Sequence, residues 1–492
     1  MFQLQKIFAP CLAGMAWCLI FAVGASAAAV VADSAYDLSG FGRLTTGGGE
    51  IPETDPHYRR VSTPAEFRAA ITDPKTKVIE IMNDLNLGWN EIPAAERKGR
   101  FRQNTPPKLH PVLLVTGVGQ IDLQDFKGLT IFSANGARIR HAGLNIKRCH
   151  QLIIRNLAFD ELWEWDEATK GNYDSNDWDY IAVDNASSNV WIDHCSFGKA
   201  YDGVLEVKGG SNNVTVSWCR FLEDDGGTNS WVRQQIVALE SNPGAHPMYG
   251  FLRAGGFSVE EIVAISRPQK KGHLIGATAF SSANAGLSVT LHHNLYVGMQ
   301  DRIPRLRGGN VHVFNIQVDN RNAYAAKLRY DARLARMSAE NAAKLTNGTY
   351  HFGVTLNGAI ATEGGAVLVE NSCFEGVRSV LRNNQGDAGN PAHTGKIRAM
   401  DVRYVYGAAK FRGDSDTPDH PLGPVQAPAL PFAWTGFEAL PYDYARDETE
   451  QVPVLLAAGA GAGRIVWPKR NWLKTRYPKP AALPPERPAV LR

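Results

Sequence analysis

The feature that most constrains the fold is an eight-residue pattern that recurs through the middle of the chain. Each copy begins with an apolar residue, has another two positions later, and usually has an aromatic or apolar residue at its eighth position. This alternation, rich in β-branched residues, predicts a strand rather than a helix. The clearest copies are residues 152–159, 190–197, 214–221, 289–296, 311–318 and 367–374, and a weaker copy begins at Leu129.

The spacing of the copies indicates how the strands are arranged. Counted from Leu129, the starting positions of successive copies differ by 23, 38, 24, 75, 22 and 56, so a step of 22 to 24 recurs with insertions. Periods of this size are typical of stacked supersecondary units. Equivalent strands of neighbouring units would pair in parallel about 4.8 Å apart. The sequence therefore predicts an all-β fold of the parallel β-helix type.

Small polar and thiol residues share one column of this pattern. Cys195, Cys219 and Asn294 occupy the sixth position of three successive copies. Side chains stacked in this way satisfy one another by hydrogen bonds or close packing. We expect free thiols here. The alternative is a disulfide between neighbouring coils, because the α-carbons of Cys195 and Cys219 would be close enough for a disulfide bond. Cys149 and Cys373 are the other cysteines of the expected mature chain.

The first residues have the form of a secretory signal. Lys6 precedes an apolar run at 7–23 that ends close to an Ala-Ser-Ala sequence. Pro10 and Gly14 interrupt the run, and no basic flank follows it, which disfavours a membrane anchor. We expect residues 1–27 to be removed and the mature protein to be exported, with no membrane attachment.

The remaining chain is predicted to form one β-helical domain over residues 28–468, followed by a basic, proline-rich tail at 469–492. A capping box at Thr63 to Glu66 predicts a short helix over 65–71 that would cap the open apolar end of the solenoid. Two insertions, at about 223–268 and 321–347, are predicted to be helical. The expected helices are at 229–240, 259–266 and 323–345. After Ala408 we expect irregular structure.

Positive charge is concentrated locally rather than spread over the chain. The formal net charge is +3 and no long Lys/Arg run occurs, so a broad nucleic-acid-binding face is not indicated. Three arginines, Arg302, Arg305 and Arg307, crowd a segment stiffened by Pro304. Guanidinium groups match carboxylate and phosphate geometry. The segment predicts either an anion-binding surface or an active site for an acidic polymer.

Carboxylates occupy corresponding positions of two neighbouring coils. Positions 179 and 202, both Asp, differ by 23, and Glu206 follows Asp202 by four, so one coil step would bring the three together. Oxygen ligands without His or Cys favour Ca²⁺. The alternative is a solvated acidic surface. A metal that faces arginines would suit proton abstraction next to a uronate carboxylate. An arginine could act as the base if neighbouring cations favour its neutral form.

These residues together resemble the pectate lyases, a family of extracellular Ca²⁺-dependent polygalacturonate lyases with a right-handed parallel β-helix. The matching segments, in order between about residues 38 and 466, are Gly40-Phe41-Gly42, Thr45-Thr46-Gly47-Gly48, Trp178-Asp179, Val190-Trp191-Ile192-Asp193-His194, Leu274-Ile275-Gly276, Leu291-His292-His293-Asn294, Arg302-x-Pro304-x-x-Arg307-x-Gly309, His312, Asn315 and the Ala-Gly repeat near Gly461.

The resemblance implies a role for each site residue. It implies Arg302 as catalytic base, Arg307 as a clamp for the substrate carboxylate, and Lys271 as the substrate-binding lysine, with Lys270 as its competitor. The implied calcium ligands are Asp179, Asp202 and Glu206, with Asp177 as an additional candidate. The implied partner is polygalacturonate, an acidic polysaccharide, and we expect a monomer. Arg305 is a variable position, and we expect it to be a solvated arginine.

Other polar residues of the motifs have a structural explanation. Asp193 and His194 lie in a row of strand residues and are expected to form an internal hydrogen-bonded pair. His292, His293 and His312 are likewise expected to be satisfied interior or edge histidines, and no zinc-ligand spacing is present.

Three other functions compete with the calcium-dependent lyase. A pectin lyase would act on the methyl ester without metal. In pectin lyases the calcium ligands are typically replaced by basic or neutral residues, whereas Asp179, Asp202 and Glu206 of this chain are acidic. A hydrolase would need paired carboxylates at glycosidase spacing. A non-catalytic glycan-binding β-helix would keep the repeat and the anion site without turnover.

Overall fold

The computed structural model describes residues 38–97, 99–103, 109–165, 176–346, 348–350, 352–384, 390–415 and 430–465. The predicted leader at 1–27 and the predicted tail at 469–492 lie outside these residues. Within the described ranges, no helix combines the length and the apolar character that crossing a membrane requires.

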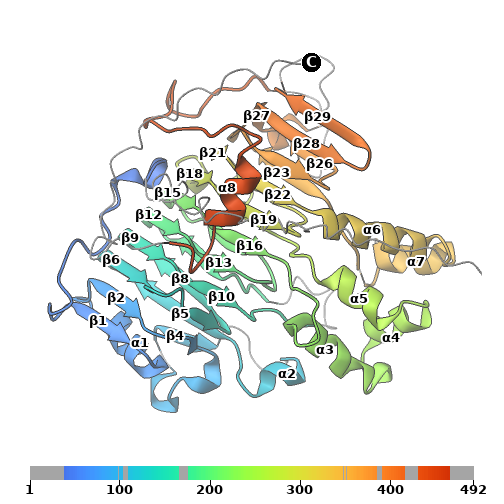
Figure 1. The fold of residues 1–492 in the computed structure, drawn as a ribbon, viewed down its shortest axis with the longest axis horizontal. Coiled ribbons are helices and arrows are strands. Elements are labelled where there is room, and N and C mark those ends of the chain that lie inside the picture. The colour runs from blue at the N-terminus through green and yellow to red at the C-terminus, as the bar shows by residue number, and fades with distance from the viewer. Residues whose placement is uncertain are drawn as a thin grey trace, which may run out of the picture.

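Three long sheets form the body of the molecule (Figure 1). Sheet A contains β1 Tyr58–Val61, β2 Val78–Ile81, β6 Lys127–Phe132, β9 His150–Arg155, β12 Ser188–Asp193, β15 Asn212–Ser217, β18 Ser288–His292, β21 Asn310–Phe314, β24 Ala366–Glu370 and β27 Lys396–Met400. Sheet B contains β3 Leu85–Asn86, β7 Arg138–Arg140, β10 Ala158–Asp160, β13 Ser196–Phe197, β16 Arg220–Leu222, β19 Leu295–Val297, β22 Gln317–Asp319, β25 Cys373–Glu375, β28 Val402–Tyr406 and β29 Ala409–Gly413. Sheet C contains β4 Phe101–Gln103, β5 Gly119–Gln124, β8 Ala142–Lys147, β11 Ile181–Asp184, β14 Leu205–Val207, β17 Leu274–Ile275, β20 Arg305–Arg307, β23 Asn357–Thr362 and β26 Ser379–Arg382.

The chain visits the sheets in a fixed rotation. From β5 to β28, consecutive strands lie in sheets C, A and B in turn, and each strand pairs in parallel with its equivalents one coil earlier and one coil later. The pairs β4–β5 and β28–β29 are antiparallel. This path is a parallel β-helix, so the predicted architecture is confirmed.

The sequence repeat lies in register in sheet A. The first positions of all seven copies are aligned partners in β6, β9, β12, β15, β18, β21 and β24. The eighth positions stack inside the solenoid: the ring centroids of Phe159 and Phe197, and of Phe197 and Phe221, are 5.1 Å apart, and Phe221 and Tyr296 are 4.8 Å apart. The periodicity therefore predicted both the strand pairing and part of the core.

The sixth column forms the expected ladder. The backbone N–H of Cys195 donates to the Cys219 sulfur at 3.4 Å, and the N–H of Cys219 donates to Asn294 Oδ1 at 2.9 Å. Cys149, Cys195, Cys219 and Cys373 are buried free thiols. The alternative of a disulfide between coils is not realised.

The fifth column of the pattern makes the bend between sheets A and B. Six residues of this column have positive φ values between 41° and 55°: Asn156, His194, Trp218, His293, Asn315 and Asn371. L residues seldom adopt this left-handed conformation, and Asn and His tolerate it better than most. Three asparagines and two histidines in six positions are therefore explained by backbone geometry.

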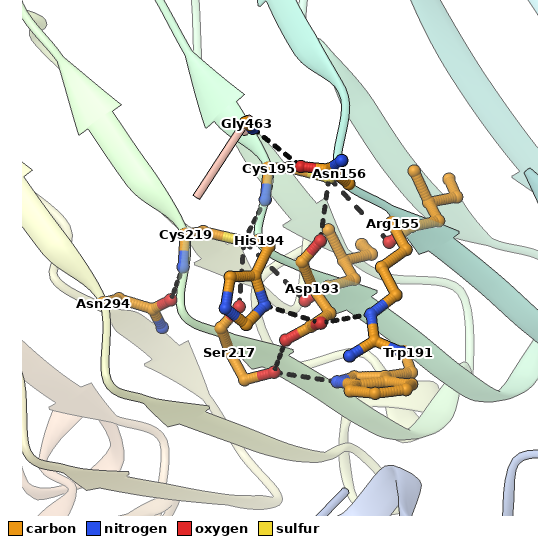
Figure 2. A network of polar contacts seen from close by, with 12 residues as sticks. Arg155, Asn156, Trp191, Asp193, His194, Cys195, Ser217, Cys219, Asn294 and Gly463 are labelled. Carbon is orange, nitrogen blue, oxygen red and sulfur yellow. Dashed lines mark hydrogen bonds and ion pairs between the residues drawn. The ribbon is translucent and has the colours of Figure 1, made fainter. Parts of the chain in front are cut away.

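A buried polar network joins three strands of sheet A (Figure 2). Asp193 in β12 accepts hydrogen bonds at 2.7 Å from Arg155 Nε in β9 and from Ser217 Oγ in β15. His194 Nδ1 lies 2.7 Å from the same carboxylate, and Trp191 Nε1 donates to Ser217. Burial alone would raise the pKa of Asp193, but His194 and Arg155 outweigh it and lower the pKa. The expected structural role of Asp193 and His194 is confirmed.

The two insertions are helical and leave the solenoid at the same corner. α3 Trp231–Glu240, α4 Pro247–Ala254 and α5 Val259–Ser266 lie between β16 and β17, and α6 Arg321–Leu334 and α7 Ala339–Thr346 lie between β22 and β23. Both insertions therefore link sheet B to sheet C, and Figure 1 shows them side by side. The single helix predicted over 323–345 is two helices, because Ser338 begins the second by accepting a hydrogen bond from the Asn341 N–H.

Other helices lie near the chain ends. α1 Pro64–Thr72 forms as predicted, with both bonds of the capping box at Thr63, and its Phe67 and Ile71 are buried in the main core. Its function as a cap of the solenoid stays a prediction. The short α2 Pro111–Leu114 and the later α8 Val452–Gly459 were not predicted. The expectation of irregular structure after Ala408 is wrong for β29 and α8.

The Gly40-Phe41-Gly42 motif lies on the outer face of sheet A. The N–H groups of Phe41 and Gly42 donate to Thr290 Oγ1 at 3.0 Å and to Thr215 Oγ1 at 2.9 Å. A Cβ on Gly42 would lie 2.8 Å from the carbonyl oxygen of Val190, so only glycine permits this approach. This motif therefore attaches the N-terminal segment to the solenoid.

We predict that Asp193→Ala lowers the free energy of unfolding by about 3–5 kcal/mol, because it leaves the Arg155 guanidinium buried without its carboxylate. Chemical denaturation monitored by circular dichroism measures the loss. Glu53→Ala, which breaks an exposed pair with Arg60, is the control and should change stability by less than about 1 kcal/mol. Equal losses in the two variants would contradict the structural role of Asp193.

Candidate functional site

The residues singled out from the sequence lie on four neighbouring strands of sheet C. These strands, β11, β14, β17 and β20, come from successive coils. Asp177 and Asp179 precede β11, Asp202 precedes β14, Glu206 lies in β14, Lys271 precedes β17, Arg302 precedes β20, and Arg307 ends it. Parallel pairing therefore brings together, on one sheet, side chains that are far apart in the sequence.

Three carboxylates converge at β11 and β14. Oxygen atoms of Asp177, Asp179 and Glu206 lie within 4.8 Å of one another. Asp179 and Glu206 are only 7% and 2% exposed, while Asp177 is exposed. Burial raises the pKa of both buried groups, and the charges of Glu206 and Asp202 raise that of Asp179 further. The cluster is therefore unfavourable in its ionised form without a cation.

The register of sheet C decides which residues meet. Ala182 is aligned with Glu206, so the coil step here is 24, and the predicted step of 23 that would align Asp179 with Asp202 is wrong by one. Gly203 lies next to Asp179 instead, and a Cβ there would be 2.8 Å from Asp179 Oδ1. Glycine at this position lets the carboxylate approach the neighbouring coil.

Asp202 lies beside the three-carboxylate cluster and is paired with Lys271. The Lys271 ammonium forms an ion pair with Asp202 Oδ1. The negative charge of Asp202 still acts on both Asp179 and Glu206. The structure thus brings Asp202 and Lys271 to the edge of the cluster.

Sequence reasoning missed Lys208. Its Nζ lies 2.9 Å from Glu206 Oε2 and 3.9 Å from Asp177 Oδ2. Burial would lower the pKa of Lys208, but Glu206, Asp179 and Asp177 raise it instead. Lys208 follows Glu206 by two positions, so the period of a strand already puts both on one face and could have indicated the pair.

The donor set fits a divalent cation that prefers oxygen. Among the described residues, Asp179 Oδ1 is buried and has no hydrogen-bond donor. One ammonium, that of Lys208, faces three carboxylates, so net negative charge remains. Carboxylate oxygens without nitrogen or sulfur ligands are typical of Ca²⁺ sites. These residues could therefore hold calcium.

The arginine segment presents a guanidinium without a partner. The Arg302 side chain makes no hydrogen bond or ion pair to any residue in the described ranges, although its backbone N–H donates to Asp301 Oδ1 at 2.8 Å. Arg307 Nη1 donates to the carbonyl oxygen of Gly276 at 3.3 Å, and its Nε is 3.8 Å from Glu363 Oε1. Arg302 is thus available to a ligand, and Arg307 is held in place.

Arg305 differs from its expectation. It is half-buried in β20 rather than solvated, and its Nε is buried without a partner within the described part of the chain. Burial and the charges of Arg307 and Arg302 lower the pKa of Arg305 to about 10. Burial also lowers the pKa of Arg307, while Glu363 and Glu206 oppose this effect. Sequence pattern alone could not reveal this burial.

Comparison with known proteins gives concordant matches. The sequence model of the family described as pectate lyase matches residues 120–228 and 262–363. The stretch between these two segments, which contains α3 and α4, is not matched. Pectate lyase B of Paenibacillus amylolyticus is 51% identical over 73% of this chain and 90% of its own length. A pectate trisaccharide-lyase of Thermotoga maritima is 28% identical over 70% of this chain and 73% of its own length. A solved pectate lyase of Paenibacillus sp. 0602 has a TM-score of 0.86 at 51% identity, covering 90% of this chain and 100% of that one.

We predict that calcium binds more tightly as the pH rises. In the calcium-free protein the pKa values of Asp179 and Glu206 lie above their ordinary 3.8 and 4.5. Between the ordinary and the raised values these groups carry protons that a cation must displace, so affinity rises with pH and levels off above the raised pKa. Titration calorimetry in buffers of different ionisation enthalpy measures affinity and proton release together.

Variants separate this site from other carboxylates. Asp179→Asn should weaken calcium binding at least about tenfold, because it removes a buried ligand. Asp225→Asn changes an exposed carboxylate of the first insertion and should have no effect. An affinity that does not depend on pH, or equal effects of the two variants, would contradict a site at Asp179 and Glu206.

Proposed function

The chain belongs to the pectate lyase family, and on that premise we propose that it cleaves polygalacturonate by calcium-assisted β-elimination with Arg302 as the base. The observation that carries this proposal is the placement, on the same sheet, of an arginine without a side-chain partner among the described residues and of a carboxylate cluster with two buried members. Arg302 precedes β20, and the carboxylates lie at β11 and β14. A uronate polymer laid across these strands would meet both.

Each cation has a role toward the substrate. Arg307 and Lys271 bind and orient uronate carboxylates, since both carry fixed positive charge beside the acidic cluster. Arg302 removes the proton from the carbon next to a carboxylate. The electron pair forms a carbon–carbon double bond, the glycosidic C–O bond at the β carbon breaks, and the leaving oxygen gains a proton from water. The products are an unsaturated uronide and a new chain end.

Other charged groups surround the proposed base. An arginine ordinarily stays protonated, so it must be neutral before it accepts a proton. Arg305 and Arg307 lie within electrostatic reach of Arg302. The proposed calcium ligands are Asp177, Asp179 and Glu206 together with Asp202. Calcium bound there would withdraw charge from the substrate carboxylate and acidify the adjacent proton.

The helical insertions flank the proposed cleft. α5 leads into β17 and α7 leads into β23, on either side of β20 in sheet C. Arg333 of α6 forms an ion pair with Glu261 of α5 at 2.7 Å, so the two insertions are joined. We propose that they wall the substrate side of a catalytic domain over residues 28–468.

We also propose that the protein is exported through a leader at 1–27 and acts as a monomer.

We predict that Arg302→Gln lowers kcat on polygalacturonate about 10²- to 10⁴-fold, the usual contribution of a general base. The ultraviolet absorbance of unsaturated products measures the rate. Arg305→Gln is the matched control, because it removes a neighbouring guanidinium of the same segment, and it should keep activity within about tenfold. A larger loss in Arg305→Gln than in Arg302→Gln would assign the base to Arg305.

A chelator separates the competing functions. Activity on polygalacturonate should disappear with a chelator and return when calcium is added. Full activity on methyl-esterified pectin under chelation would indicate a pectin lyase. Binding without any unsaturated product would indicate a glycan-binding β-helix instead.

We predict that Lys271→Gln raises KM for polygalacturonate about tenfold or more, because a charged contact to the substrate is lost. Lys270→Gln is the matched control and should leave KM within about twofold. Steady-state kinetics on both variants measure the effect. A larger effect at Lys270 would assign substrate binding to that residue.

A further inference from the structure

Phe280 combines exposure with an unfavourable backbone conformation. It lies in the loop after β17, the residue is 57% exposed, and its φ is 58°. The left-handed region is a genuine outlier for a bulky residue and usually needs a surrounding structure that enforces it. A single exposed apolar residue needs no explanation. An exposed aromatic residue in a backbone conformation that favours glycine does need an explanation, because burial of its ring does not account for it.

The loop is tied to the proposed substrate clamp. The Phe280 backbone N–H donates to Glu363 Oε2 at 2.7 Å, and the other oxygen of that carboxylate is 3.8 Å from Arg307 Nε. One carboxylate therefore fixes both the position of Phe280 and that of the Arg307 guanidinium. The Phe280 ring also lies 5.1 Å from the His393 ring, at an angle of 51°. The aromatic side chain is thus held at a defined place close to Arg307.

A surface hollow adjoins this ring. Its volume is about 260 Å³, and it lies directly beside the end of β20, at the glycines that follow Arg307. Its lining includes Phe280, Asn284, Gly308, Glu363 and Thr435. Ligand sites usually combine an apolar or aromatic wall with a few placed polar groups. Here the wall is Phe280. The charged group in the lining is Glu363, and Arg307, whose Nε lies 3.8 Å from that carboxylate, is next to the hollow.

We propose that Phe280 is a specificity-determining residue that packs its ring against the apolar C–H face of the sugar next to the one whose carboxylate Arg307 binds. This inference rests on the proposed function. The face of an aromatic ring is electron-rich and attracts the weakly positive hydrogens of a sugar face. The contact does not involve the carboxylate, so it recognises the pyranose ring and complements the charge contact of Arg307.

The first test is steady-state kinetics on polygalacturonate. Phe280→Ala should raise KM about fivefold and leave kcat within about twofold, because the contact binds substrate without touching the reacting atoms. Phe280→Tyr keeps an aromatic face and should stay within about twofold of the unaltered protein. Phe411→Ala is the matched control, since Phe411 is an exposed phenylalanine in β29, and it should change neither constant. An unchanged KM in Phe280→Ala overturns the proposal.

A second variant separates binding from backbone structure. Phe280→Gly removes the ring and relieves the left-handed residue, so its Tm should equal or exceed that of the unaltered protein, while its KM rises as in Phe280→Ala. A rise in Tm with unchanged KM would show that the ring has no binding role.

Salt dependence tests whether Phe280 acts only by positioning Arg307. The ratio of variant to unaltered KM should stay constant between low and high salt for Phe280→Ala, because the contact is apolar. For Arg307→Gln the ratio should shrink as salt screens the lost charge. If the Phe280→Ala ratio shrinks in the same way, the direct contact is excluded. Absence of turnover by the unaltered protein would instead refute the proposed function, and the inference with it.

Discussion

Parallel pairing between successive coils is the constraint on which both the core and the candidate site depend. Because each strand pairs in register with its equivalents, a residue type that recurs at one column becomes a row along the solenoid. Inside, this alignment builds the aromatic stack from Phe159 to Tyr296. Outside, it arranges carboxylates, a lysine and arginines on four neighbouring strands of sheet C. A change of one position in register would turn these side chains to the other face.

The electrostatics of the outer face differ from those of the interior in one respect. The buried Asp193 is satisfied by Arg155, Ser217 and His194, so its charge stabilises the stack of strands. The buried Asp179 has a raised pKa, and its Oδ1 has no donor among the described residues. The arginines of β20 are likewise crowded and half-buried. Polar groups with few partners among the described residues are suited to bind partners from outside the protein, which in the proposed function are a cation and an acidic polymer.

Departures from the regular coil are concentrated at one corner and in a few loops of this chain. Both helical insertions join sheet B to sheet C, which leaves the pairing of the coils intact while it changes the surroundings of the site (Figure 1). The Phe280 loop follows β17 at the opposite end of the strands of sheet C. Its link to Arg307 runs through a single carboxylate, Glu363. The solenoid thus supplies the positions of the site residues, and the connections form their surroundings.

The sequence by itself determined the coil period, seven of the ten strands of sheet A with their register, and the residue types of the site, because a solenoid repeats the same local pattern in every coil. It also indicated that the thiols of the sixth column stack. Only the tertiary structure decided the register that sets Glu206 against Ala182, the pairing of Asp202 with Lys271, the place of Lys208 and the burial of Arg305. These depend on how loops of unequal length pack around the strands. Such packing brings together residues from different coils, and these contacts cannot be predicted from a periodic pattern in the sequence.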